Sequence, residues 1–286
     1  MQVHLVDGTY ELFRAHFGAP RATTRDGVEV GATRGLLRSL RALCKQPGVT
    51  HVAIAFDTVI ESFRNQLFAG YKTGAGVEPE LMAQFPLAER AARSLGLLTY
   101  SMIEFEADDA LATAAARTAL DPRVERVVIA SPDKDLLQMV RGTRIVALDR
   151  RRELVLDQDA VVQKLGIVPE SVPDWLALVG DAQDGIPGIA RFGEKSASAV
   201  LRRYLHLEAI PDDANDWDVA VRGKEALAQN LAAARSESLL YRQLATLRTD
   251  VPIAAEVDDL VYRGPDRDAL RALCAELEFD SFAERA

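Results

Sequence analysis

Cysteine is scarce in this chain, and long apolar runs are missing. The 286 residues include 2 cysteines, Cys44 and Cys274, which lie far apart in helix-like apolar patterns. This spacing indicates two core thiols and predicts neither a disulfide framework nor a thiolate zinc site. No apolar run reaches the roughly 18 residues that a membrane-spanning helix needs. No basic segment with a cleavage site precedes the strand-like run Val3 to Val6, so we expect a soluble cytoplasmic protein without membrane contacts.

Positive charge is in the minority. Lys and Arg together number 34 against 43 Asp and Glu, which gives a formal net charge of −9. This balance argues against a general polyanion binder. A protein that gathers many acids around metal ions can nevertheless be acidic overall and still present a local basic track. The apolar share of 48% and the charged share of 27% indicate a globular chain, long enough for one large domain or two smaller ones.

Three acids stand within the four residues Glu106-Ala107-Asp108-Asp109, directly before an Ala-rich helix expected over Ala110 to Leu120. Positions three apart share a helix face, so Glu106 and Asp109 are expected to point the same way, with Asp108 beside them. Two carboxylates about 4 Å apart repel by roughly 1 kcal/mol in water and about 4 kcal/mol in a partly desolvated cleft, and a divalent cation is the simplest neutraliser. The alternative is an acidic helix N-terminus that the helix dipole favours.

Other acids lie at the end of, or just past, short apolar runs that are typical of buried strands. The runs are Val3 to Val6, His51 to Phe56 and Arg126 to Ala130. Their alternation with helical patterns predicts an α/β domain with a mainly parallel sheet, and the carboxyl edge of that sheet would collect the acids. The alternative for any single Asp is a turn former or a helix cap. The acids that follow the runs are Asp7, Asp57, Asp133 and Asp135.

Beyond the α/β pattern the chain becomes helical, and we place a domain boundary near residue 165. Two further acids, Asp181 and Asp184, precede the glycine-bracketed turn Gly188 to Gly193, which opens onto a helix. Backbone N–H groups at the start of such a helix suit a phosphate, and Arg191 and Lys195 lie beside them. The alternative is a plain helix–turn–helix packing element.

Read together, these segments form several separated motifs in a fixed order along essentially the whole chain. The motifs are Leu5-Val6-Asp7-Gly8 with Phe13-Arg14-Ala15, Ala55-Phe56-Asp57 with Ser62-Phe63-Arg64 and Tyr71-Lys72, Glu106-Ala107-Asp108-Asp109, Asp133-Lys134-Asp135-Leu136, Gly180-Asp181, Asp184-Gly185-Ile186-Pro187-Gly188-Ile189 with Gly193-Glu194-Lys195, and the tail segments Leu247-Arg248-Thr249-Asp250-Val251-Pro252 and Leu277-Glu278-Phe279. In this order and spacing they resemble the structure-specific 5′ nuclease family, which includes the flap endonucleases and the 5′-nuclease domain of bacterial DNA polymerase I.

The resemblance implies a PIN-like α/β domain with a mainly parallel sheet over residues 1–165, followed by a helical domain over residues 166–286. In the family the helical part contains a helix–three-turn–helix that grips duplex DNA, often with a potassium ion held by backbone oxygens. No polymerase domain follows in this chain, so we expect a freestanding version. We also expect a monomer.

The resemblance also implies two Mg²⁺ or Mn²⁺ ions in one active site. Such hard cations take oxygen ligands, and no histidine lies in the motifs. Two ions of this kind activate a water and stabilise the leaving oxygen in phosphodiester hydrolysis. The expected metal-site residues are Asp7, Asp57, Glu106, Asp108, Asp109, Asp133, Asp135, Asp181 and Asp184.

Further roles are implied for basic and aromatic residues. Lys72 and Arg64 would stabilise charge on the reacting phosphate. Tyr71 would stack on a terminal base, and Arg14 would help to position the strand. The turn in the helical part would bind the duplex backbone without reading sequence, so specificity would be for structure. The expected DNA-binding residues of this turn are Gly188, Ile189, Arg191, Gly193, Lys195 and Ser196.

Two positions depart from the family pattern. The basic residue expected three positions after Lys72 is Ala75, and Gly185 stands after Asp184 where Asn is usual. The first departure bears on how the arch over the active site holds the scissile phosphate and threads a free 5′ strand. Neither departure removes one of the nine acids.

The resemblance therefore implies a metal-dependent 5′-3′ exonuclease or flap endonuclease that hydrolyses DNA near flaps, 5′ ends and junctions, in replication or repair. Two alternatives stay open. A PIN-type ribonuclease would use the same metal chemistry on single-stranded RNA, but it leaves Asp181 to Ala197 without a purpose. A non-catalytic DNA-junction binder would gain nothing from nine carboxylates that face phosphates. The sequence predicts no particular replication or repair protein as a partner.

Overall fold

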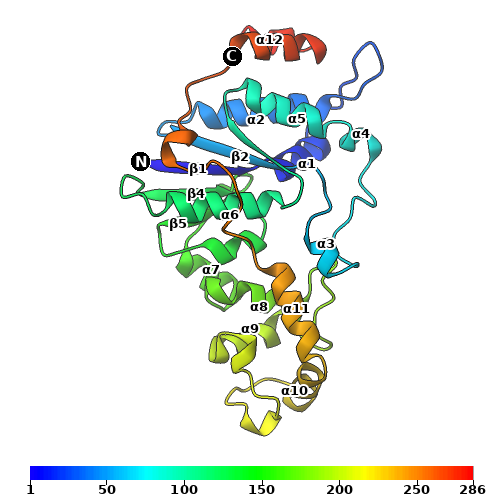
Figure 1. Cartoon of the computed structure of the whole chain (residues 1–286), viewed down its shortest axis with the longest axis vertical. Helices are drawn as coiled ribbons and strands as arrows, with labels where there is room; N and C mark the ends of the chain where they lie inside the picture. The colour runs from blue at the N-terminus through cyan, green and yellow to red at the C-terminus, as the bar shows by residue number, and fades with distance from the viewer. Residues whose placement is uncertain (286) are drawn as a thin grey trace. The chain divides into compact units, whose positions relative to one another are not determined.

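Residues 1–285, which the computed structural model describes, form two units that interleave along the chain (Figure 1). Unit 1 takes in Met1–Ser62, Gly74–Ser131 and the residues from Arg248 onward, and unit 2 takes in Phe63–Thr73 and Pro132–Leu247. The domain boundary expected near residue 165 stays a prediction, because the units are not divided at a single point of the chain. Within the described residues, no helix combines the length and the apolar composition needed to cross a membrane.

Unit 1 is built on a parallel sheet with helices on both faces. Its strands lie in the order β3-β2-β1-β4, and each neighbouring pair is parallel. In Figure 1, α2 and α5 lie on one side of β1 and β2, and α6 lies on the other. The elements of unit 1 are β1 (Gln2–Asp7), α1 (Gly8–Gly18), α2 (Gly31–Cys44), β2 (His51–Asp57), α4 (Pro79–Met82), α5 (Phe85–Ser94), β3 (Leu98–Met102), α6 (Ala107–Thr118), β4 (Arg126–Ala130), η5 (Val257–Leu260), α12 (Arg267–Glu276) and α13 (Asp280–Ala283).

The apolar runs explain these elements. Residues 52–56 of β2 are all buried, as expected for a strand that helices cover on both faces. In α2, Leu36, Leu37, Leu40 and Leu43 recur at helical spacing, and each is at most 1% exposed. The predicted strands at Val3, His51 and Arg126 are therefore confirmed, and so is the mainly parallel sheet.

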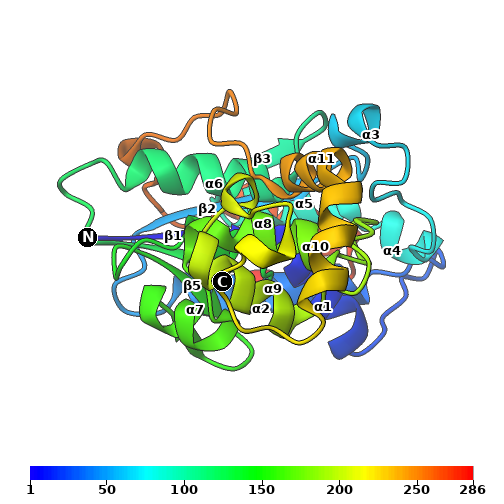
Figure 2. The same ribbon diagram turned by 90° about the horizontal axis from the view of Figure 1, so that it is seen from below.

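Unit 2 combines an antiparallel hairpin with a set of helices. Strands β5 and β6 pair antiparallel, with Ala147 opposite Leu156. Helix α8 packs against α9 and α11, and Figure 2 shows these three helices grouped together. Trp175 and Leu176 of α8 are at most 3% exposed at the centre of the apolar cluster of unit 2. The elements of unit 2 are α3 (Arg64–Leu67), η1 (Asp135–Met139), β5 (Ile145–Asp149), β6 (Leu154–Leu156), α7 (Gln158–Leu165), η2 (Pro169–Ser171), α8 (Val172–Val179), α9 (Glu194–Tyr204), η3 (Leu207–Ala209), η4 (Ala214–Asp216), α10 (Lys224–Ala233) and α11 (Arg235–Ala245).

A close approach at Gly8 fixes the carboxyl ends of two neighbouring strands. A Cβ on Gly8 would lie 2.6 Å from the Phe56 ring and 2.7 Å from the Ala55 carbonyl oxygen. The missing side chain therefore lets the start of α1 touch the end of β2. The Asp57 backbone N–H also donates to Thr9 Oγ1 at 2.8 Å. These contacts hold the acid that ends β2 beside the turn that follows β1.

Gly8→Ala should therefore lower the free energy of unfolding by about 1–3 kcal/mol, because the added methyl overlaps the Phe56 ring and a carbonyl oxygen. Urea unfolding followed by circular dichroism measures this loss. Gly18→Ala in the same helix is the matched control, since a Cβ there meets nothing within 4 Å. A Gly8→Ala protein as stable as Gly18→Ala would contradict this account of the β1–α1 turn.

Candidate metal centre

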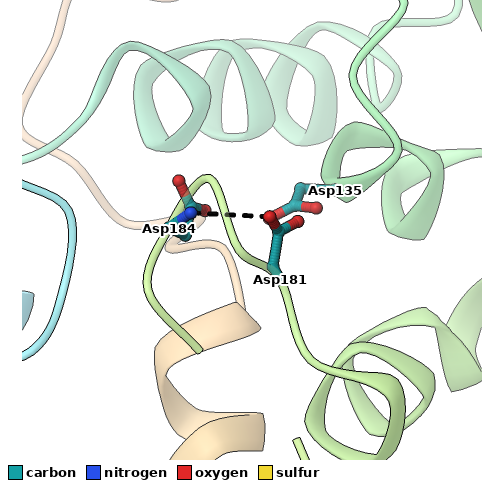
Figure 3. Close-up of side chains that lie close together, drawn as sticks. All are labelled: Asp135, Asp181 and Asp184. Atoms are coloured by element: carbon teal, nitrogen blue, oxygen red, sulfur yellow. Dashed lines mark hydrogen bonds between the residues drawn. The ribbon is translucent and has the colours of Figure 1, made fainter. Parts of the chain in front are cut away.

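Three carboxylates gather in unit 2. Asp135, Asp181 and Asp184 each offer an oxygen, and these oxygens all lie within 4.8 Å of one another (Figure 3). Asp135 is the first residue of η1, just past the end of β4 in the sequence, and the other two acids come from the turn after α8. Figure 3 shows the Asp135 and Asp181 side chains pointing toward each other. Of the nine expected metal-site acids, these three have the arrangement of a cation site.

Backbone hydrogen bonds hold the turn that carries two of these acids. Helix α8 ends at Val179, and its C-cap Gly180 has a φ of 87°, which is open to glycine but strained for other residues. Asp181 and Ile186 then exchange two N–H···O bonds of 2.8 Å each. The Asp181 carboxylate accepts the Gln183 N–H at 2.8 Å and the Asp184 N–H at 3.4 Å, and the latter contact is dashed in Figure 3. Hydrogen bonds within the chain therefore position Asp181 and Asp184 in this turn.

The charge of the cluster is only partly neutralised. Lys134 Nζ lies 2.8 Å from the Asp181 carboxylate. Burial lowers the pKa of Lys134, but the hydrogen bond and the charge of Asp181 outweigh this effect and raise it. Asp135 is 6% exposed, and its Oδ1 has no hydrogen-bond partner among residues 1–285. Burial, and then the charges of Asp133, Asp184 and Asp181, raise the pKa of Asp135 well above its usual range.

A divalent cation fits this environment. The donors are carboxylate oxygens, which Mg²⁺ and Mn²⁺ prefer to nitrogen or sulfur. The Lys134 ammonium pairs with one of the three carboxylates, that of Asp181, and the buried Asp135 Oδ1 has no donor among residues 1–285, at a cost comparable to a lost hydrogen bond. A hard cation at this point would satisfy that oxygen and remove the repulsion.

Asp7 and Asp57 stand at the carboxyl ends of neighbouring strands, as predicted. Asp7 pairs in register with Ala55, so the two acids lie at the same edge of the sheet. Both also accept hydrogen bonds from the chain. Asp7 accepts the Tyr10 N–H at 2.8 Å and the Ser131 hydroxyl at 2.8 Å, while Asp57 accepts the Ala107 N–H at 2.8 Å. Asp7 thus caps α1 while it presents an acid at the sheet edge.

The quartet at residues 106–109 differs from the expected geometry. Helix α6 begins at Ala107, three residues earlier than expected, and Glu106 is its N-cap rather than a helical residue. Glu106 and Asp109 form a capping box, in which the Asp109 carboxylate accepts the Glu106 N–H at 3.1 Å. Asp109, which is fully buried, also accepts the Arg248 N–H at 2.9 Å. Both acids thus cap the start of α6, and their place in a metal site stays a prediction, as does that of the half-buried Asp108.

Arg64 and Tyr71 lie in the interior of unit 2. Arg64 is 1% exposed and donates to the carbonyl oxygens of Leu244 and Thr246 at 2.7 and 3.0 Å. Tyr71 is 3% exposed and belongs to the apolar cluster of unit 2. Both side chains are thus enclosed by the protein in the free chain. The phosphate contact expected for Arg64 and the base stacking expected for Tyr71 stay predictions.

Arg14 and Lys72 are more accessible. The Arg14 side chain is 29% exposed and contacts the carboxylate of Glu11 and, at 2.7 Å, the Ser39 hydroxyl. Lys72 is half-buried, and its backbone N–H donates to the Asp184 carbonyl oxygen at 3.0 Å. The structure thus ties the chain at Lys72 to one acid of the metal cluster, a contact that no pattern in the sequence indicates.

The turn before α9 has the predicted form, with one exception. Gly193 is the N-cap of α9, and its N–H donates to Ser196 Oγ at 2.9 Å. Arg191 and Lys195 are exposed beside it. Ile189 is instead 5% exposed and its side chain packs in the apolar cluster of unit 2, while its N–H donates to the Leu178 carbonyl oxygen at 2.8 Å.

Lys134 is the residue of this site that the sequence did not single out. It lies within one of the motifs, but its pairing with Asp181 joins positions 47 residues apart and leaves no local pattern.

The glycine at position 185, where Asn is usual, is also explained by a contact with a residue far away in the sequence. Its φ is +72°, and a Cβ there would lie 2.1 Å from the Gly70 carbonyl oxygen, so the usual Asn would not fit this backbone.

Comparison with known families identifies the class. The model described as "5′-3′ exonuclease, N-terminal resolvase-like domain" matches residues 2–166, and "5′-3′ exonuclease, C-terminal SAM fold" matches residues 167–268. The chain therefore belongs to the 5′-3′ exonuclease family. The predicted family and fold class, an α/β region followed by a helical one, are confirmed.

Particular relatives are DNA polymerases I. The chain is 37% identical over 289 residues to that of Pseudomonas aeruginosa, 33% identical over 287 residues to that of Bacillus caldotenax and 35% identical over 289 residues to that of Mycobacterium tuberculosis. These matches cover 98% of this chain but 31%, 32% and 31% of the respective relatives. The chain thus spans about a third of the length of the curated relatives it matches.

Solved structures share the fold at low sequence identity. T5 5′-exonuclease with bound zinc matches with a TM-score of 0.71 and 17% identity, covering 100% of this chain and 98% of that one. The catalytic core of Rad2 in complex with DNA substrate matches with a TM-score of 0.63 and 14% identity, covering 99% of this chain and 90% of that one. These likenesses establish the fold.

In metal-free protein, Asp135→Asn should raise the melting temperature by a few degrees at pH 8, and by less at pH 5. Because the folded-state pKa of Asp135 is raised, its protonated form stabilises the fold at low pH, and this contribution is lost as the pH rises through that pKa. Thermal melts in EDTA across this range measure the effect. Exposed Asp159→Asn is the control, and a gain for Asp135→Asn that does not change with pH would contradict the prediction.

Proposed function

We propose that this chain is a divalent-metal-dependent nuclease that hydrolyses DNA phosphodiester bonds near flaps, free 5′ ends and duplex junctions. It would act as a 5′-3′ exonuclease and a flap endonuclease. The observation that carries the proposal is the cluster of Asp135, Asp181 and Asp184, in which a buried carboxylate oxygen of Asp135 has no partner among residues 1–285. Membership of the 5′-3′ exonuclease family supports the reaction class.

We assign two Mg²⁺ or Mn²⁺ ions to the site, and when bound they would activate a water and stabilise the leaving 3′-oxygen. As proposed metal ligands, we add the acids at the strand ends to the three clustered acids. Glu106 and Asp109 would act mainly by holding the start of α6, since both take part in its capping box. T5 5′-exonuclease binds zinc ions, and the T5 D15 flap endonuclease was solved with DNA and metal ions. The proposed metal-site residues are Asp7, Asp57, Glu106, Asp108, Asp109, Asp133, Asp135, Asp181 and Asp184.

Basic residues of the chain would hold the DNA. Lys72 would contact the reacting phosphate, because its main chain is bound to that of Asp184. Arg14 would help to position the strand. The exposed Arg191 and Lys195 would bind the duplex backbone at the start of α9, where main-chain N–H groups and the helix dipole favour a phosphate. Gly188, Gly193 and Ser196 would shape this turn, and a potassium ion would be held by its backbone oxygens.

The finer features of the protein are proposed with this activity. The division into a catalytic and a DNA-binding domain would fall near residue 165. The protein would work as a monomer in the cytoplasm, in DNA replication or repair.

Cleavage of a 5′-labelled double-flap DNA tests the activity. We expect the wild-type protein to cut at the flap base with Mg²⁺ or Mn²⁺ and not in EDTA. Asp135→Asn should lower the rate by on the order of 100-fold or more, because it removes a charge that holds the cation. Asp159→Asn, exposed on α7, removes an equal charge far along the chain from the cluster and should leave the rate unchanged.

Two other outcomes would replace the proposal. Faster cleavage of an unstructured RNA than of the DNA flap would indicate a PIN-type ribonuclease. Metal-independent binding of the flap with no cut by the wild-type protein would indicate a DNA-junction binder.

Lys195→Ala should weaken binding to a nicked duplex in EDTA and reduce the slope of log Kd against log salt by about 1, since one phosphate contact is lost. Fluorescence anisotropy between 50 and 200 mM KCl gives the slope. Lys164→Ala removes an exposed lysine from the end of α7 and is the matched control. Equal slopes for the two variants would remove the α9 turn from the DNA-binding surface.

A further inference from the structure

The segment Phe63–Thr73 belongs to unit 2 although it lies far before the rest of that unit in the sequence. Arg64 anchors its first end. The guanidinium donates to the carbonyl oxygens of Leu244 and Thr246 and lies 4.7 Å from the centre of the Phe63 ring. These carbonyls lie at the C-terminal end of α11, where helix carbonyls lack partners within the helix. The buried arginine therefore completes α11 and fixes the start of the segment.

Contacts inside the segment fold it back on itself. Asn65 Nδ2 donates to the Lys72 carbonyl oxygen at 2.9 Å and to that of Tyr71 at 3.3 Å. The Tyr71 N–H donates to Phe68 at 3.0 Å, and the Phe68 ring packs edge-on against Tyr241 at 6.0 Å between ring centres. The segment is thus a closed loop that presents residues 70–72 at its far end.

The far end of the segment packs against the turn that carries Asp181 and Asp184. The Lys72 N–H donates to the Asp184 carbonyl oxygen at 3.0 Å, and the Tyr71 hydroxyl lies 3.4 Å from Asp184 Oδ2. Gly185 makes this approach possible. A Cβ at position 185 would lie 2.1 Å from the Gly70 carbonyl oxygen, well inside van der Waals contact, and the φ of +72° adds strain for any other residue.

We infer that Gly185 is a positioning residue, whose missing side chain lets the main chain at Lys72 bind that of Asp184. The inference rests on the proposed function, in which Lys72 contacts the reacting phosphate and Asp184 a metal ion. The chain then holds the phosphate contact and the metal ligand at a fixed spacing before DNA arrives. Substrate binding would not have to order this pair, so less binding free energy is lost to ordering.

Hydrogen exchange of the free protein tests the docking without any catalysis. Gly185→Ala should speed exchange of the Lys72 amide at least roughly tenfold, because a main-chain hydrogen bond opens locally. Gly223→Ala is the matched control, since its φ of +75° brings the same strain but a Cβ there meets nothing within 4 Å. Tyr71→Phe should retain protection, since it removes the hydroxyl contact and leaves the main-chain bond. Unchanged exchange in Gly185→Ala would overturn the docking.

Steady-state cleavage of the double-flap DNA tests the positioning role. Gly185→Ala should lower kcat by on the order of 10-fold or more, since small misplacements of catalytic groups have effects of this size. Gly223→Ala should keep the wild-type kcat. A Gly185→Ala protein with faster Lys72 exchange and an unchanged kcat would overturn the role.

A second variant covers failure to fold. If Gly185→Ala melts far below Gly223→Ala, Asn65→Ala opens the same loop from its other side without touching the turn, and the same two measurements apply. If the wild-type protein cuts no DNA, the proposed function fails, while the exchange experiment still decides whether Gly185 docks the segment.

Discussion

Mutual repulsion among carboxylates is the main electrostatic constraint at the cluster of three acids in unit 2. Asp135, Asp181 and Asp184 are held close enough to share one cation, and the ammonium group of Lys134 offsets part of their charge. Repulsion of this kind grows as water is excluded, and Asp135 is nearly fully buried. The fold tolerates the arrangement because backbone bonds, such as the pair between Asp181 and Ile186, hold the acids in place. Main-chain hydrogen bonds therefore hold these acids in an arrangement that favours a divalent cation.

Several acids of the chain cap a helix and also place a carboxylate at the edge of the sheet. Asp7 caps α1, and Glu106 and Asp109 cap α6, so the carboxylates at the sheet edge also begin the helices that follow. A cap is worth about 1 kcal/mol to the fold, and it also fixes the rotamer of the acid. Stability and placement of charge thus come from the same hydrogen bonds. Because the same carboxylates cap the helix, an acid-rich stretch can resemble a simple helix start.

Much of the fold could be predicted from residue patterns. Strands at Val3, His51 and Arg126 follow from short apolar runs, because a strand buried on both faces needs apolar residues throughout. The family follows from motifs whose order and spacing extend along the chain. The sequence pattern places the start of α6 at Ala110, three residues later than in the structure, because acids are favoured both at an N-cap and in the first helical turn.

The linear order of residues determined which acids the chain carries and which of them follow strands, since strands and turns are set by local composition. It left open the partners of each side chain. Arg64 contacts the Leu244 carbonyl oxygen, 180 positions away, at the end of α11, and Tyr71 lies in the apolar cluster of unit 2. The need for glycine at position 185 becomes clear only from its close approach to the Gly70 carbonyl oxygen in the folded chain. Burial and pairing of this kind arise from long-range packing, and long-range packing leaves no periodic trace in the sequence.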